Sequence, residues 1–249
     1  MITFCKDKRA IIKALNSLES SDYLKAVVNL YLEAYGAKYS FCEFFIEYKE
    51  NIAVALILRY NSFLYCITDE KADLSELSMW ISGFENSQVY VDRLALAQGI
   101  SGVYETCYEL KFKNNGERNF PSSCKTLEES FELKNCAKLV CRGKSIDITD
   151  EFYLDLSHMV RHGNLSVFGI YHGDTAVSVA GVSLGSEIAV INFLITDEYF
   201  RGNGFARQLL HDICNVDTRE YLLLSSESNL DFYSKCGFIT QNKCYLVKI

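Results

Sequence analysis

The chain has 249 residues, of which 49% are apolar and 13% aromatic, so it can bury a sizeable core and is not a disordered chain. Its formal net charge is −7 at pH 7, with lysine and arginine dispersed along the sequence. The chain has no basic stripe of the kind that displaces counterions from DNA or RNA, so a nucleic acid is not expected as a partner. No stretch has the roughly twenty uninterrupted apolar residues of a membrane-spanning helix, so no membrane partner is expected either.

The beginning of the chain leads into a charged helical segment rather than the apolar core of a signal peptide, which predicts a cytoplasmic protein. The ten cysteines are scattered, include no Cys-x-x-Cys pair, and in several cases lie within apolar runs, as Cys66 and Cys141 do. This pattern predicts buried free thiols rather than a disulfide framework.

The first part of the chain has two helical patterns followed by three apolar runs. Helical periodicity is present over residues 6–17 and 22–34, and strands are expected at 41–48, 52–60 and 63–68. The sequence therefore predicts two helices before a three-stranded meander.

The most polar and turn-rich stretch of the chain spans residues 114–125 and contains its only proline, Pro121. Such a composition is typical of a linker. We therefore expect an accessory domain of residues 1–113 and a second domain of residues 126–249.

An apolar run in the second half ends at Thr196 and leads through a short acidic turn into the segment Arg201 to Ala206. A helical pattern follows. Glycines at 202 and 204 let the chain turn tightly and bring bare backbone N–H groups close to an anion. The helix that follows adds its unpaired N–H groups and its positive dipole end, so the segment predicts a phosphate-binding loop.

Two common nucleotide loops do not fit this segment. A Walker A loop needs a lysine after the second glycine, and the Rossmann fingerprint needs a third glycine at Arg207. The segment instead resembles the acetyl-CoA loop of the GNAT acyltransferases, whose pattern Arg/Gln-x-x-Gly-x-Gly/Ala is met by Arg201, Gly204 and Ala206.

A second motif follows at the separation expected for this family. After an apolar strand at 221–225, residues 229–238 resemble the closing helix of GNAT proteins and its Tyr-x-x-x-Gly-Phe ending, which Tyr233, Gly237 and Phe238 match. Gly237 is expected to end the helix, and Phe238 to begin the last strand. The resemblance covers residues 165–249 and implies an α+β fold with a mixed, mostly antiparallel GNAT-type sheet flanked by helices.

Three short segments of the first half recur in the second. Residues 45–54 read like 168–177, the sequence Ile67-Thr68-Asp69-Glu70 recurs at 195–198, and Cys107-Tyr108 recurs at 244–245. The halves are therefore interpreted as two tandem GNAT-like domains. Residues 71–75, which follow Glu70, contain no glycine, so the first copy is expected to be degenerate and the chain to bind one cofactor. The first copy would cover the active domain, shape its acceptor site or mediate a homodimer.

The resemblance implies acetyl-CoA as the cosubstrate. In this family the backbone of a splayed fourth strand contacts the thioester and the pantetheine arm, and the glycine loop binds the pyrophosphate. The corresponding cofactor-binding residues are Leu194, Ile195, Thr196, Arg201, Gly202, Asn203, Gly204, Phe205, Ala206 and Arg207.

Tyr233 matches the position at which many relatives place the tyrosine that protonates the departing thiolate. A phenol with a pKa near 10 suits this task, because a thiol has a pKa of about 8.5. The alternative role of Tyr233 is packing of the last helix against the sheet. For Arg201, a phosphate contact, a loop-shaping role and plain surface exposure are all open.

The general base stays open. The strand before the cofactor contacts carries no acid, and the candidates are Glu187, Glu227, His158 and His162. The two histidines are four residues apart and could also form a metal pair, but no third ligand is evident and no metal is expected. His172 lies in a hairpin turn and is expected to be solvated.

The sequence thus predicts an acetyl-CoA-dependent N-acyltransferase that acts on the amine of a small molecule. The negative net charge favours cationic acceptors. Two alternatives remain. One is a non-catalytic acyl-CoA-binding sensor or interaction module, and the other is a tandem GNAT-like enzyme that uses an aminoacyl-tRNA.

Overall fold

The computed structural model describes residues 1–113, 125–126, 130–144, 149–173 and 175–249. Of the predicted linker, residues 114–124 lie outside the described residues, and Lys125 begins a short strand. The chain forms two compact units. Unit 1 comprises Met1–Leu110, Leu224–Leu230 and Thr240–Ile249, and unit 2 comprises Lys111–Leu223 and Asp231–Ile239.

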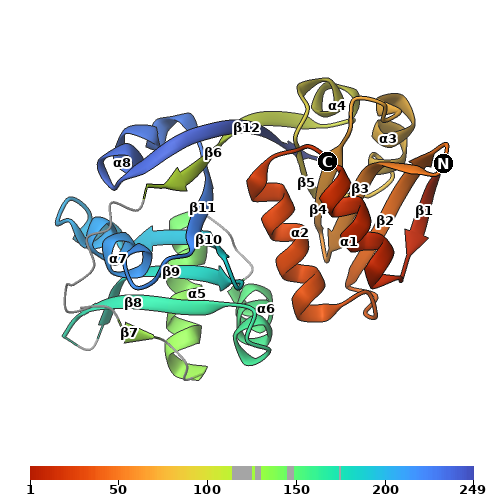
Figure 1. Cartoon of the computed structure of the whole chain (residues 1–249). Helices are drawn as coiled ribbons and strands as arrows, with labels where there is room; N and C mark the ends of the chain where they lie inside the picture. The colour runs from red at the N-terminus through yellow and green to blue at the C-terminus, as the bar shows by residue number, and fades with distance from the viewer. Residues whose placement is uncertain (114–124, 127–129, 145–148, 174) are drawn as a thin grey trace. The chain divides into compact units, whose positions relative to one another are not determined.

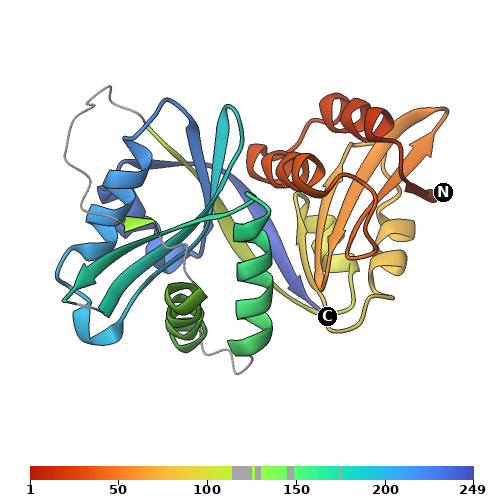
Figure 2. The ribbon, with the colours of Figure 1, turned by 90° about the horizontal axis from the view of Figure 1, so that it is seen from below.

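Unit 1 is a sheet with helices on both faces. In chain order its elements are β1 (Ile2–Cys5), α1 (Lys8–Ser17), α2 (Asp22–Tyr35), β2 (Cys42–Lys49), β3 (Ile52–Tyr60), β4 (Phe63–Thr68), α3 (Leu74–Ile81), β5 (Gln88–Val91), α4 (Leu94–Gly99) and most of β6 (Val103–Phe112). Figure 2 shows α1 and α2 over one face of the sheet and α3 and α4 over the other. The helices and the meander predicted for this part of the chain are confirmed.

The last strand of the chain completes the sheet of unit 1. The end of β12 (Phe238–Lys248) pairs antiparallel with β5, where Tyr245 lies opposite Val91. The strand order in this unit is β1-β2-β3-β4-β5-β12-β6. The units are therefore not continuous in sequence, whereas the predicted domains of residues 1–113 and 126–249 follow the chain without this exchange.

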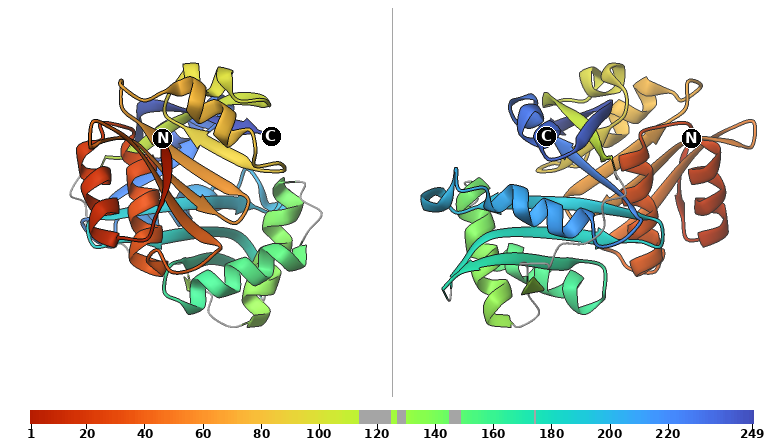
Figure 3. Two further views of the ribbon diagram at one scale, coloured as in Figure 1. Left: turned by 90° about the vertical axis from the view of Figure 1, so that its right-hand side faces the viewer. Right: turned by 60° about the vertical axis from the view of Figure 1, so that its left-hand side comes forward.

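Unit 2 repeats the architecture. Its elements are β7 (Lys125–Thr126), α5 (Ser130–Lys144), α6 (Thr149–Arg161), β8 (Ser166–His172), β9 (Thr175–Leu184), β10 (Ile188–Thr196), the 3₁₀ turn η1 (Glu198–Phe200), α7 (Phe205–Cys214), the first part of β11 (Glu220–Ser225) and most of α8 (Leu230–Lys235). A second 3₁₀ turn, η2 (Glu227–Asn229), precedes α8. In Figure 1, α7 lies in front of the strands and α5 behind them, and Figure 3 shows these strands from two further sides.

Both parts of the chain have the same order of elements, namely a strand, two helices, three strands, a helix, a strand, a helix and a strand. The repeated sequence segments occupy corresponding positions. The Asp69 amide that follows β4 donates to the Val54 carbonyl at 2.8 Å, and the Asp197 amide that follows β10 donates to the Val177 carbonyl at 2.9 Å. These matching hydrogen bonds support the interpretation of the halves as tandem copies.

The cysteines of the described part of the chain are free thiols, and six of them are buried. They are Cys42, Cys66, Cys136, Cys141, Cys214 and Cys244. Burial raises the pKa of the Cys42 and Cys136 thiols to about 12, so both pack as neutral, small apolar groups. Within the described residues, no helix is both long and apolar enough to cross a membrane.

A buried carboxylate in unit 1 should make stability depend on pH. Glu47 of β2 is fully buried, its Oε2 has no hydrogen-bond partner among the described residues, and its Oε1 lies 3.4 Å from the Asp73 amide. Burial raises the pKa of Glu47 above its ordinary value of 4.5. Because the folded state holds this proton more tightly than the unfolded chain, the contribution of Glu47 to stability is present at low pH and lost as pH rises through the folded pKa.

We therefore expect Glu47→Gln to reduce the fall in stability between acid and neutral pH, measured by urea unfolding at a series of pH values. The exposed Glu85 provides the control, because Glu85→Gln makes the same change in charge without removing a buried carboxylate. Equal pH slopes for the wild type and Glu47→Gln would contradict this prediction.

Candidate functional site

The site begins where β10 separates from its neighbour. β10 pairs in parallel with β11 only over Ile188, Ala189 and Val190, although the strand continues to Thr196. Its other edge stays paired with β9 as far as Thr196. The predicted contact residues Leu194, Ile195 and Thr196 are half-buried in this last part of β10. The backbone of these three residues therefore pairs with β9 on one edge and not with β11 on the other. This is the arrangement that the GNAT resemblance implies for the splayed strand.

A β-bulge lies at the start of this unpaired part. The pairing of β10 with β9 shifts between Ile191 and Phe193, so Asn192 is the extra residue. The side-chain amide of Asn192 donates to the Ser183 hydroxyl at 2.8 Å. The bulge redirects the backbone of β10 just before the candidate site. No pattern in the sequence predicts this bulge.

A close contact holds the bulged strand on the sheet. A Cβ placed on Gly181 of β9 would lie 2.2 Å from Cε1 of the Phe193 ring, so only glycine leaves room for this ring. We expect Gly181→Ala to lower the free energy of unfolding by about 1–3 kcal/mol through overpacking, measured by urea unfolding. Gly83→Ala is a suitable control, since the nearest atom to a Cβ there is a carbonyl oxygen at 3.3 Å. Equal stabilities of the two variants would contradict the prediction.

The end of β10 is anchored by polar contacts. The hydroxyl oxygens of Ser178 and Thr196 are 2.9 Å apart. Asp197 accepts from the Tyr199 amide at 3.1 Å, and its other carboxylate oxygen lies 3.2 Å from Nη2 of Arg142. Ser178 and Arg142 were missed in the sequence analysis, because their link to the loop depends on packing between distant elements.

Two glycines shape the loop that follows. Gly202 has φ +80° and Gly204 has φ +84°, a region that side-chain-bearing residues rarely adopt. No atom lies within 4 Å of a Cβ built at either position. Glycine is therefore favoured here by the backbone conformation, whereas the space around a Cβ is open.

The loop opens onto the start of α7. Gly204 is the N-cap, so no side chain caps this helix, and its first turn contains no acidic residue. Phe205, Ala206 and Arg207 form that first turn. Their N–H groups are among those that an α-helix leaves unpaired. An open, uncapped N-terminus with positive dipole character can accept an anion.

The polar side chains of the loop stabilise its backbone. Arg201 is exposed, and its Nε donates to the Thr196 carbonyl at 3.3 Å. The Asn203 amide donates to the Phe200 carbonyl at 3.1 Å. Of the roles considered for Arg201, this contact favours shaping of the loop. Burial raises the pKa of the Cys236 thiol, which follows α8, and the exposed Arg207 at the start of α7 offsets this only in part.

Tyr233 lies in α8, as predicted, and the helix ends before Gly237 with φ +92°. Its ring packs against Phe238, with the ring centres 5.7 Å apart, and against Phe232 at 5.1 Å. Burial raises the pKa of Tyr233 to about 12, with the nearby Cys236 thiol adding to the effect. Tyr233 is therefore protonated at neutral pH and is a weaker acid than the ordinary phenol assumed from the sequence.

The candidates for a general base are spread over different elements. Glu187 and Glu227 are exposed, before β10 and within η2. The rings of His158 and His162 lie together at the end of α6, with centres 4.1 Å apart. Burial lowers the pKa of His158, and the neighbouring His162 lowers it further. His172 is exposed.

The described residues contain no group of three or more histidine, cysteine, aspartate or glutamate side chains that could hold a metal ion.

Residues 149–247 match the family model of the acetyltransferase (GNAT) domain. This part of the chain is a GNAT domain. The loop from Arg201 and the Tyr-x-x-x-Gly-Phe ending both lie within the matched region, which confirms the resemblance that these two motifs carry. A search of curated proteins gave no match.

Solved GNAT structures are similar to the whole chain. A GCN5-related N-acetyltransferase from Sphaerobacter thermophilus is 12% identical, with a TM-score of 0.62 over 98% of this chain and 94% of that one. A GNAT-family acetyltransferase from Colwellia psychrerythraea is also 12% identical, with a TM-score of 0.60 over 100% and 99%. A tandem GNAT protein from the clavulanic acid biosynthesis pathway is 8% identical, with a TM-score of 0.62 over 100% and 98%.

At these identities the similarity establishes the fold alone. It confirms the predicted α+β class, a mixed and mostly antiparallel GNAT-type sheet flanked by helices, and the tandem arrangement of two such domains.

Proposed function

We propose that the GNAT domain binds acetyl-CoA and transfers its acetyl group to the amine of a small molecule. The observation that carries this proposal is the open N-terminus of α7, which follows two glycines in positive φ and lies directly after the unpaired end of β10. Backbone groups of Leu194 to Thr196 would bind the thioester and the pantetheine arm. N–H groups from Gly202 to Arg207 would bind the pyrophosphate.

The reaction would proceed by direct transfer. The neutral amine attacks the carbonyl carbon of the thioester, and the C–S bond breaks as the thiolate leaves. The Tyr233 hydroxyl donates a hydrogen bond to the sulfur. The proton lost by the acetylated nitrogen passes to solvent, from which the released thiolate takes up a proton. With a pKa of about 12, Tyr233 acts chiefly by hydrogen-bonding the sulfur as charge develops there, because a thiol has a pKa of only about 8.5.

The general base is not needed if the enzyme binds the neutral fraction of the amine. None of the acidic candidates is buried beside the proposed thioester contacts, since Glu187 and Glu227 are both exposed. An acceptor whose amine is partly neutral near pH 8 would suit such a site. The net charge of −7 favours the approach of cationic amines but does not select among them.

The decisive experiment is calorimetric titration of the purified chain with acetyl-CoA, followed by an amine screen with detection of the released thiol. We expect micromolar binding at one site per chain and thiol release with at least one primary amine. Binding without turnover for any amine would instead favour the acyl-CoA-binding sensor. Absence of binding would overturn the proposal. Turnover only with an aminoacyl-tRNA would support the third function considered from the sequence.

A further inference from the structure

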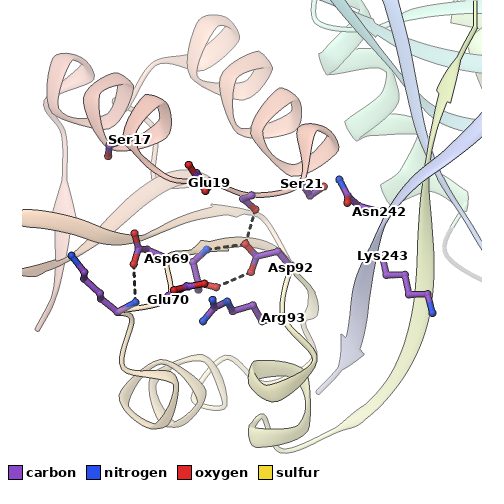
Figure 4. A pocket seen from close by; sticks show the side chains of 12 residues that line it. Ser17, Glu19, Ser21, Asp69, Glu70, Asp92, Arg93, Asn242 and Lys243 are labelled. Carbon is purple, nitrogen blue, oxygen red and sulfur yellow. Dashed lines mark hydrogen bonds between the residues drawn. The ribbon is translucent and has the colours of Figure 1, made fainter.

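A cavity of about 630 Å³ lies wholly within unit 1. It is formed by the loop between α1 and α2, by the residues that follow β4 and β5, and by β12, and Figure 4 shows the side chains that surround it. It occupies the end of the β4–β5 pair that corresponds to the β10–β11 end in unit 2. Its volume is typical of a small-molecule site.

Unit 1 cannot offer this cavity to the phosphates of acyl-CoA. The helix α3 that follows β4 is capped by Asp73, whose carboxylate accepts from the Ser75 and Glu76 amides, both at 3.1 Å. A second acid, Glu76, stands in the first turn. The N–H groups and the dipole that α7 leaves open are therefore satisfied in α3 by carboxylates of the chain itself.

The thioester position of unit 1 is also occupied by a side chain. β4 remains paired with β5 as far as Cys66, so only Ile67 and Thr68 extend beyond the pairing. Asp92 accepts from the Thr68 amide at 3.0 Å and from its hydroxyl at 2.8 Å. The Asp92 carboxylate thus engages the backbone at the end of β4, at the position where a pantetheine arm would need a free backbone group. A ligand of unit 1 is thus of a different class.

The hydroxyl groups of the wall have already donated their protons. Ser20 donates to Asp92 at 2.5 Å, and Ser21 donates at 2.6 Å to Glu109, which is fully buried behind the wall. Thr68 donates to Asp92 as described above. The Ser21 oxygen also accepts from the Leu24 amide at 3.2 Å and from the Cys244 thiol at 3.3 Å, so it is fully used. Ser20 and Thr68 can offer only acceptor lone pairs to the cavity. This part of the wall therefore suits a ligand that brings donors, such as an ammonium group.

Glu109 adds further acceptor capacity. Its Oε1 has no hydrogen-bond partner among the described residues. Burial raises the pKa of Glu109, and the Ser21 hydroxyl, the Tyr23 amide and the Asn242 side chain offset this only in part. Ser21 and Asn242 both line the cavity, so this buried carboxylate lies directly behind them.

The remaining charges of the wall are balanced and unpaired. Three carboxylates line the cavity together with three cations, and no ion pair within the described residues joins any of the six. They are Glu19, Asp69, Glu70, Lys71, Arg93 and Lys243. In Figure 4, Glu70 extends from the loop after β4, and Arg93 follows Asp92. The Asp69 carboxylate accepts from the Lys71 backbone amide at 2.7 Å, and the Lys243 ammonium lies 5.5 Å from the centre of the Tyr108 ring. Carboxylates and cations that surround one cavity without forming ion pairs suit a ligand that carries both charges.

We propose that this cavity of unit 1 binds a zwitterionic ligand of the amino-acid type, with its ammonium group toward the carboxylates and hydroxyls and its carboxylate toward Arg93 and Lys71. The inference is independent of acyl transfer in unit 2, because every lining residue belongs to unit 1.

The first test is a thermal-shift screen of the full chain with the standard L-amino acids, in the absence of any acyl-CoA. At least one of them should raise Tm saturably by about 2–4 °C. Its N-acetyl derivative, which lacks the ammonium charge, and its methyl ester, which lacks the carboxylate, should both lose the effect. If no amino acid shifts Tm, or if both derivatives act as well as the parent, the proposal is wrong.

Variants then place the ligand. By calorimetry with the amino acid found in the screen, Glu70→Gln and Arg93→Gln should each weaken binding about tenfold. Glu85→Gln and Lys38→Gln make the same changes of charge at exposed positions outside the cavity and should leave binding unchanged. Equal binding by all four variants would overturn the site. Gly204→Glu, which targets unit 2, should not affect this binding, so failure of either proposal can be told from failure of the other.

Discussion

Replacing Tyr233 by phenylalanine should lower kcat by roughly a hundredfold while leaving acetyl-CoA affinity unchanged. The variant keeps the ring that packs on Phe232 and Phe238 and removes only the hydroxyl. A packing role predicts almost no change in rate, whereas a hydrogen-bond donor to the departing sulfur predicts the full loss. Initial rates of thiol release and calorimetry with acetyl-CoA separate these two roles.

The control is Tyr104→Phe, which removes the hydroxyl of an exposed tyrosine in unit 1 and should leave kcat unchanged. The pH profile gives an independent check. Because burial raises the pKa of Tyr233 to about 12, its phenol stays protonated throughout the usual assay range, and kcat should not fall between about pH 8 and 10. A fall in that range that disappears in Tyr233→Phe would contradict this assignment, and an unchanged rate in Tyr233→Phe would assign Tyr233 a packing role.

Introducing a carboxylate into the glycine loop should abolish measurable acetyl-CoA binding. In Gly204→Glu the new side chain enters open space at the start of α7, where its charge would neutralise the helix N-terminus and repel the pyrophosphate. We expect affinity to fall at least about a hundredfold, measured by calorimetry, with a cost to folding of about 1–2 kcal/mol from the φ of +84°.

Gly163→Glu is the matched control, because Gly163 also has positive φ, +73°, and no atom within 4 Å of a built Cβ. It lies after α6 and outside the loop, so it should show the same loss of stability and retain acetyl-CoA binding. If both variants bind normally, the loop does not hold the pyrophosphate. If both lose binding, the effect is one of folding and not of charge.

Local sequence determined the elements and the loop. The meander strands Ile52–Tyr60 and Phe63–Thr68 have the predicted bounds, because their apolar runs are bounded by turn residues. The loop glycines at 202 and 204 and Gly237 adopt positive φ where their motifs place them. In each case the conformation depends on the residue itself and on its immediate neighbours, so a pattern of a few residues suffices to predict it.

Contacts between distant residues were decided only by the tertiary structure. The end of β12 pairs with β5 in unit 1, across more than half of the chain, and no local pattern distinguishes that partner from another strand. The absence of glycine from residues 71–75 predicted that the first copy lacks a phosphate loop. The structure shows that the Asp73 carboxylate caps α3 where α7 has an open N-terminus, and that Asp92 holds the end of β4. A carboxylate accepts hydrogen bonds from the donors that the fold brings within about 3 Å of it. The sequence identifies the carboxylate, but only the tertiary structure identifies those donors.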